Sequence, residues 1–141
     1  MKARSTGPSA TRAPRVTDTG IRRLVGVLGP ALIGWALCGA TIGIGRALTS
    51  MQNTLIAHAI AAPLIFAAVA YLYFKKFNYT TPLQTAVIYV LAVMLMDLVV
   101  VATFIEQSYA MFGSLLGTWL PFALIFGSTY AVGLHIVREG E

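Results

Sequence analysis

Four stretches of the chain, each about twenty residues long, consist almost entirely of apolar side chains. They cover residues 24–44, 54–74, 83–105 and 111–132. An α-helix of about 20 residues crosses the ~30 Å hydrocarbon core of a bilayer. Backbone groups in lipid must be paired internally, and the runs lack the alternation of β-barrel strands. We therefore predict an all-α integral membrane protein, a four-transmembrane-helix antiparallel bundle.

The composition supports a membrane protein and excludes a soluble domain. Of the 141 residues, 57% are hydrophobic and 11% are charged, whereas soluble domains carry about 25% charged residues. The connections, at residues 45–53, 75–82 and 106–110, are short, so consecutive helices should be antiparallel neighbours. Pro82 suits the first turn of the third helix, and Thr80 or Thr81 should cap it.

The Lys and Arg residues predict the orientation of the four spans. In a four-span arrangement Arg46 falls alone on one side, and the other nine fall together on the opposite side: Lys2, Arg4, Arg12, Arg15, Arg22, Arg23, Lys75, Lys76 and Arg138. Cytoplasmic loops carry the excess of positive charge. We expect a multi-pass protein of the bacterial or archaeal plasma membrane with both termini in the cytoplasm.

Residues 1–20 contain almost no large apolar side chain, and we expect a disordered, basic cytoplasmic tail. The net charge of +5 lies largely in this tail, which favours the lipid bilayer rather than nucleic acid as a partner. Two alternatives stay open. The tail has the composition of a transit peptide, and residues 24–37 could form a signal-peptide core cleaved after Ala40.

Asp97 is the most informative single residue. It lies in LAVMLMDLVVVATF, with only apolar neighbours for several positions on either side. An ionised carboxylate at the centre of a membrane helix costs about 2.5–3.5 kcal/mol on insertion scales. Such a side chain should face protein or water, where it is either an ion- or proton-binding group or a structural hydrogen-bond partner for a neighbouring helix.

His58 is the natural partner of Asp97. At about 1.5 Å per residue, His58 lies ~6 Å and Asp97 ~12 Å below the same surface. A His–Asp pair would keep the imidazole charged or fix its tautomer. The alternative is a helix-end histidine hydrated at the membrane surface.

Arg46 and Glu106 are predicted at the outer surface, where they could pair across the mouth of the bundle. Exposed ion pairs contribute about 0–1 kcal/mol, so interfacial anchoring is their simplest role. Glu106 is nine positions after Asp97, which is nearly the opposite face of an α-helix. One straight α-helix would therefore not aim both carboxylates at one place.

Small and hydroxylated residues mark faces for helix packing or for a permeation path. The hydroxyls of the fourth span, with Pro121, follow helical spacing, and two GxxxG pairs occur in the first and fourth spans. These residues are Ser114, Thr118, Ser128, Gly39, Gly43, Gly113 and Gly117. Small residues let helices approach closely, within one chain or between two.

Several chemistries have no signal in the sequence. Cys38 is the single cysteine, and no Cys/His cluster with zinc spacing or phosphate-binding glycine loop occurs. We therefore expect no catalytic residue, no metal site, no cofactor and no enzyme activity.

The size and layout resemble the small multidrug resistance transporters and the double-barrelled fluoride channels. The multidrug resistance transporters have a glutamate in the first helix that this chain lacks. The glycine-rich run at residues 39–50 differs in spacing from that of the fluoride channels. We therefore assign no family.

Two functional hypotheses follow. The first is a small transporter or channel-like protein, a homo-oligomer with its path between subunits, in which Asp97 and His58 bind ions or protons. The second is an accessory or assembly subunit of a larger membrane complex that docks a membrane protein partner through its glycine faces. An intramembrane enzyme or lipid-binding protein is a third, weaker alternative.

Overall fold

The computed structural model describes residues 16–141, and their side chains from Thr19 onward. The chain forms four α-helices, with three shorter helical segments between the third and the fourth, and the described residues contain no strand. The α-helices are α1 (Val16–Leu48), α2 (Met51–Lys76), α3 (Pro82–Met96) and α4 (Leu120–Glu139). The shorter segments are the π-helix η1 (Asp97–Ile105), the 3₁₀-helix η2 (Ala110–Gly113) and the π-helix η3 (Leu115–Trp119).

The predicted all-α bundle of four spanning helices is confirmed. The four apolar helical segments have 24 to 30 residues each, at Thr19–Leu48, Met51–Lys76, Pro82–Ile105 and Leu115–Glu139. Each therefore exceeds the length that crosses a bilayer. Residues 1–15 of the predicted tail lie outside the described residues. The helix α1 begins at Val16, so it includes the last five residues assigned to the tail.

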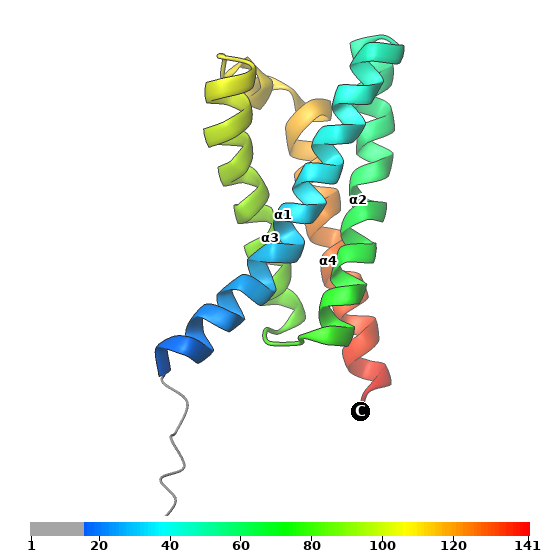
Figure 1. Cartoon of the computed structure of the whole chain (residues 1–141). Coiled ribbons are helices and arrows are strands. Elements are labelled where there is room, and N and C mark those ends of the chain that lie inside the picture. The colour runs from blue at the N-terminus through cyan, green and yellow to red at the C-terminus, as the bar shows by residue number, and fades with distance from the viewer. Residues whose placement is uncertain (1–15) are drawn as a thin grey trace, which may run out of the picture.

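The two ends of the bundle differ in charge. The start of α1, the α2–α3 connection and the end of α4 lie together at one end, which we call the terminal end (Figure 1). It carries Arg22, Arg23, Lys75, Lys76 and Arg138. The other end, called the Arg46 end, carries Arg46 alone among the described Lys and Arg residues.

The helix pairs differ in one respect from the sequence-based expectation. The helix α2 packs extensively against α1 and α4, and α3 packs against α4 and α1. The consecutive helices α2 and α3 are therefore diagonal across the bundle rather than neighbours. Large aromatic side chains bridge this diagonal, because Phe66 and Tyr73 of α2 contact Tyr89 of α3 at ring-centroid distances of 5.9 and 6.1 Å. All three side chains are essentially fully buried.

Glycines other than those of the GxxxG pairs bring the helices together. An added Cβ at Gly34 would lie 2.8 Å from the ring of Phe66, and one at Gly133 would lie 2.8 Å from Phe74 and Pro82. In contrast, no atom lies within 4 Å of an added Cβ at Gly39 or Gly43. Close approaches inside the chain therefore occur at Gly34 and Gly133, and also at Gly26 and Gly45, where an added Cβ would lie 2.8 Å from Tyr79 and 2.6 Å from Thr54.

The start of α3 follows its predicted capping. Thr81 Oγ1 accepts a hydrogen bond from the Gln84 backbone N–H at 3.3 Å, and Gln84 Oε1 accepts one from the Thr81 N–H at 3.2 Å. This capping box, followed by Pro82 in the first turn, satisfies two backbone donors that have no helical partner. It fixes where α3 leaves the α2–α3 connection.

Gly133→Ala should destabilise the bundle, because the added methyl group overlaps Phe74 and Pro82. Overpacking of this kind costs about 1–3 kcal/mol. Gly127→Ala is the matched control, because no atom lies within 4 Å of the position of the new methyl group. Equilibrium unfolding in mixed detergent–SDS micelles measures both. Equal stabilities of the two variants would contradict this packing.

Candidate functional site: an acidic cavity

The third span changes its helical form at Asp97. Upstream the backbone is α-helical, and from Asp97 to Ile105 it is a π-helix, with hydrogen bonds between residues five apart. The Glu106 N–H donates to the Val101 carbonyl oxygen at 2.8 Å, and the Thr103 hydroxyl donates to the Leu98 carbonyl oxygen at 2.9 Å. Segments of this kind occur frequently at functional sites.

The π-helix corrects the expectation for Glu106. In an α-helix, nine residues would place Glu106 opposite Asp97. With about 4.4 residues per turn, as hydrogen bonding to the fifth residue implies, nine residues make roughly two full turns. Glu106 therefore lies on the same side of the span as Asp97. Val101, which lies between the two in the sequence, shares one cavity with Asp97 and a second hollow with Glu106.

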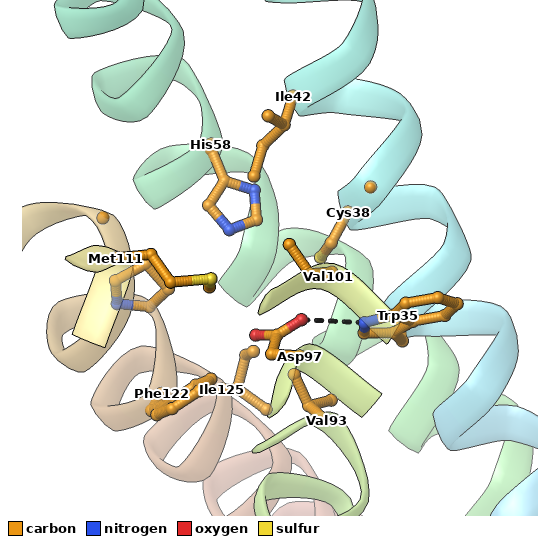
Figure 2. Close-up of a pocket in the computed structure, with 13 residues that line it drawn as sticks. Trp35, Cys38, Ile42, His58, Val93, Asp97, Val101, Met111, Phe122 and Ile125 are labelled. Atoms are coloured by element: carbon orange, nitrogen blue, oxygen red, sulfur yellow. Dashed lines mark hydrogen bonds between the residues drawn. The ribbon is translucent and has the colours of Figure 1, made fainter. Parts of the chain in front are cut away.

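Trp35 of α1 is the direct partner of Asp97. Its indole Nε1–H donates a hydrogen bond to Asp97 Oδ1 at 2.8 Å, across the interface between the first and third spans (Figure 2). Hydrogen bonds to an ionised acceptor are about twice as strong as neutral ones. The bond ties α1 to the π-helix and leaves the second carboxyl oxygen facing the interior of the bundle.

Asp97 lies at a small cavity inside one chain. The cavity has a volume of about 70 Å³, with apolar walls that include Val93, Phe122 and Ile125. A single water molecule needs about 10–15 Å³ of such space. The cavity is therefore large enough for a few water molecules or one partly hydrated small ion. All four spans of one chain contribute to its walls. The path between subunits that the sequence suggests stays a prediction.

His58 lies in the same cavity, on the side nearer the Arg46 end (Figure 2). The residue is 7% exposed, and its Nδ1 atom has no hydrogen-bond partner among the described residues. A buried polar atom without a partner costs about 1–3 kcal/mol. The expected proximity of His58 and Asp97 is therefore present, although the carboxyl bonds to Trp35 rather than to the imidazole.

A second hollow, called the vestibule, lies beside the cavity on the side of the Arg46 end. It measures about 260 Å³ and shares Ile42, Val101, Met111 and Gly117 with the cavity walls. Arg46 Nη1 and Glu106 Oε1 form an ion pair at its mouth, as predicted from the sequence. The vestibule thus lies between the Arg46 end and the cavity of His58 and Asp97, and the four residues that the two hollows share are apolar.

The predicted hydroxyl stripe divides between two environments. Ser114 and Thr118 line the vestibule. Ser114 Oγ accepts from the Gly117 N–H at 2.9 Å, and Thr118 Oγ1 donates to the Met111 carbonyl oxygen at 2.6 Å, so both organise the break before η3. Ser128 bonds to the Ile125 carbonyl oxygen and lines neither hollow.

The GxxxG residues are also divided. Gly117 lines both the cavity and the vestibule, and Gly39 lines the cavity. Gly43 and Gly113 are exposed and have no atom within 4 Å of an added Cβ. Contact between helices at Gly43 and Gly113 would therefore require a second chain.

Trp35, Cys38 and Met111 also belong to the site, and the sequence analysis gave them no role there. Trp35 could have been predicted from the Arg46–Glu106 pair. Trp35 precedes Arg46 by eleven residues, and Asp97 precedes Glu106 by nine. With a rise of about 1.5 Å per residue, Trp35 and Asp97 are expected at similar depths in the membrane. Nothing local distinguishes Cys38 or Met111 from ordinary apolar residues of a membrane helix.

The site does not form a metal centre of protein ligands. Among the described residues, no three His, Cys, Asp or Glu side chains lie close enough to hold one metal ion. The arrangement can instead accept a proton or hold a small, partly hydrated cation at the free carboxyl oxygen.

Comparison with protein families, curated proteins and solved structures finds no match to this chain. The description of the site therefore rests on its own geometry.

The Trp35–Asp97 hydrogen bond should be visible by NMR. The chain has two tryptophans, and Trp119 Nε1–H donates to the Phe112 carbonyl oxygen instead. In protein labelled with ¹⁵N-tryptophan, Asp97→Asn should move the Trp35 indole signal upfield because a neutral amide oxygen is a weaker acceptor than a carboxylate. Trp35→Phe assigns the signals. An unchanged Trp35 signal, or an equal shift of Trp119, would contradict the contact.

Proposed function

We propose that this small membrane protein is a transporter or channel-like protein for protons or small monovalent cations, with Asp97 as the binding group. The single observation that supports it most is that a carboxyl and an imidazole line one cavity inside the bundle, with the vestibule beside it on the side of the Arg46 end. Ionisable groups inside membrane proteins typically mark ion paths and proton relays.

Each residue of the route has a proposed part. The Arg46–Glu106 pair controls entry, because an ion would meet both charges at the mouth of the vestibule. Ser114 and Thr118 offer oxygen atoms beyond the mouth. His58 then exchanges a proton or repels a cation according to its charge, and Asp97 holds the ion.

The buried aromatic rings of the bundle would close the proposed route on its other side. From Asp97 toward the terminal end, the bundle is filled by Phe66, Tyr73 and Tyr89, each at most 1% exposed. Passage to the terminal end would require these rings to separate. In the proposed alternating-access cycle, this is the state in which ions enter from the Arg46 end while the other end is closed.

We propose that the terminal end faces the cytoplasm of a prokaryotic cell. The five described Lys and Arg residues there, against Arg46 alone at the other end, support this orientation. Ions would then enter the vestibule from outside the cell.

One observation favours the second hypothesis, that of an assembly subunit. Gly43 and Gly113 present open, exposed backbone to the surrounding bilayer, and small residues typically occur where membrane helices meet. A second copy or another membrane protein would cover these surfaces. In that role the glycines rather than Asp97 would carry the function.

Asp97→Asn should abolish ion flux without loss of folding, because the asparagine oxygen still accepts the Trp35 hydrogen bond while the titratable charge is lost. Proteoliposomes containing a pH or cation indicator, with an imposed gradient of H⁺, Na⁺ or K⁺, measure the flux. We expect the variant to fall to the level of protein-free vesicles.

Glu139→Gln is the matched control, since it also converts a carboxylate to an amide. Glu139 lies at the terminal end, 3.3 Å from His135, and its variant should conduct like the natural protein. Undiminished flux in Asp97→Asn, or no flux of any of the three ions in the natural protein, would reject the proposal and favour the assembly subunit.

A further inference from the structure

A second, separate hollow lies at the terminal end, between the first turns of α1 and the α2–α3 connection. This hollow, called the lipid groove, has a volume of about 510 Å³ and shares no residue with the Asp97 cavity. Ligand sites in proteins typically measure about 300–1,000 Å³. The groove is therefore large enough for part of a bound molecule.

The floor of the lipid groove is an apolar stripe of α1. Ile21, Val25, Gly29 and Ile33 are four residues apart along the helix, and the three large side chains are 60–63% exposed. No atom lies within 4 Å of an added Cβ at Gly29. Because Gly29 has no side chain, it leaves a depression in the middle of the stripe. The stripe is long and apolar enough for an acyl chain to lie along it.

The wall of the groove is held in place by the fold. The rings of Phe77 and Tyr79 lie together, with centroids 5.8 Å apart. Tyr79 lies directly against Gly26, where an added Cβ would be 2.8 Å from the ring, and its backbone N–H donates to the Tyr73 hydroxyl at 3.1 Å. The groove is therefore formed before a ligand arrives, which lowers the entropy cost of binding.

The charge at the edge of the groove is positive. Arg22 lines it, and Lys76 Nζ lies 5.4 Å from the centre of the Phe77 ring on the opposite wall. Basic side chains between membrane helices recognise anionic lipid headgroups. A second copy of this chain in the same orientation would bring another basic terminal end to the same place, and like charges oppose such contact.

We propose that the lipid groove binds one anionic phospholipid of the surrounding bilayer. Its phosphate lies between Arg22 and Lys76, and one acyl chain follows α1 past Val25 into the depression at Gly29. The lipid would fasten the α2–α3 connection to the start of α1, at the end of the bundle opposite the vestibule.

Native mass spectrometry tests this proposal with two lipids of equal chain length, phosphatidylglycerol and phosphatidylcholine, titrated separately into the detergent-solubilised full chain. The dissociation constant of the first bound lipid is measured for each. We expect phosphatidylglycerol to bind more tightly. Arg22→Gln and Lys76→Gln should each weaken it about fivefold, the effect of one basic side chain near anionic lipid. Gly29→Leu should weaken both lipids by filling the depression.

Two matched controls distinguish a site from general attraction. Arg138→Gln removes a charge at the same end but outside the groove, and Gly127→Leu adds an exposed side chain on α4, where no atom lies within 4 Å of an added Cβ. Neither should change lipid binding. Equal affinity for the two lipids, unchanged binding in Gly29→Leu, or equal losses in Arg138→Gln and Arg22→Gln would overturn the proposal.

Discussion

A carboxyl group in the middle of a membrane span must be kept out of hydrocarbon, and the arrangement of the bundle around Asp97 meets this requirement. Exposure to lipid would cost about 2.5–3.5 kcal/mol on insertion scales. The indole of Trp35 donates to one carboxyl oxygen at 2.8 Å, and the other oxygen faces a cavity formed by all four spans. The positions of α1, of the π-helix and of the cavity are therefore linked through one side chain.

Two π-helical segments give the site its shape. The first begins at Asp97 and turns the third span so that Glu106 reaches the same side as Asp97. The second, Leu115–Trp119, follows the break at Ser114 and places Gly117 against both the cavity and the vestibule. The wider turns and the break open the Arg46 end, whereas regular α-helices and buried aromatic rings close the terminal end.

The sequence was sufficient for the spans, because apolar length and backbone pairing in lipid leave few alternatives. It also predicted the Arg46–Glu106 pair, since this pair follows from the helical rise along antiparallel spans. The predicted α-helical phase failed for Glu106, because the residues from Asp97 to Ile105 carry no local signal that distinguishes a π-helix from an α-helix. The diagonal placement of α2 and α3 depends on packing at Gly34 and Gly133, which a one-dimensional pattern does not contain.

The Asp97 cavity with its vestibule and the lipid groove lie toward opposite ends of the bundle and differ in chemistry. The vestibule lies at the Arg46 end, where we propose that ions enter, and the groove proposed for a lipid headgroup lies at the terminal end. Between them lies the aromatic core of Phe66, Tyr73 and Tyr89. Under the proposed function, ions that move to the terminal end would have to pass this core, so the conformational change that the proposal requires should be centred there.

The most direct test of the central claim uses Cys38, the single cysteine, which lines the Asp97 cavity and is 5% exposed. A membrane-impermeant thiol reagent is added to one side of vesicles of known protein orientation, and alkylation is followed by mass spectrometry. The account predicts slow reaction only from the side opposite the chain termini, and faster reaction in Arg46→Ala, which removes the ion pair at the mouth of the vestibule. Reaction only from the terminal side, or a rate unaffected by Arg46→Ala, would contradict it.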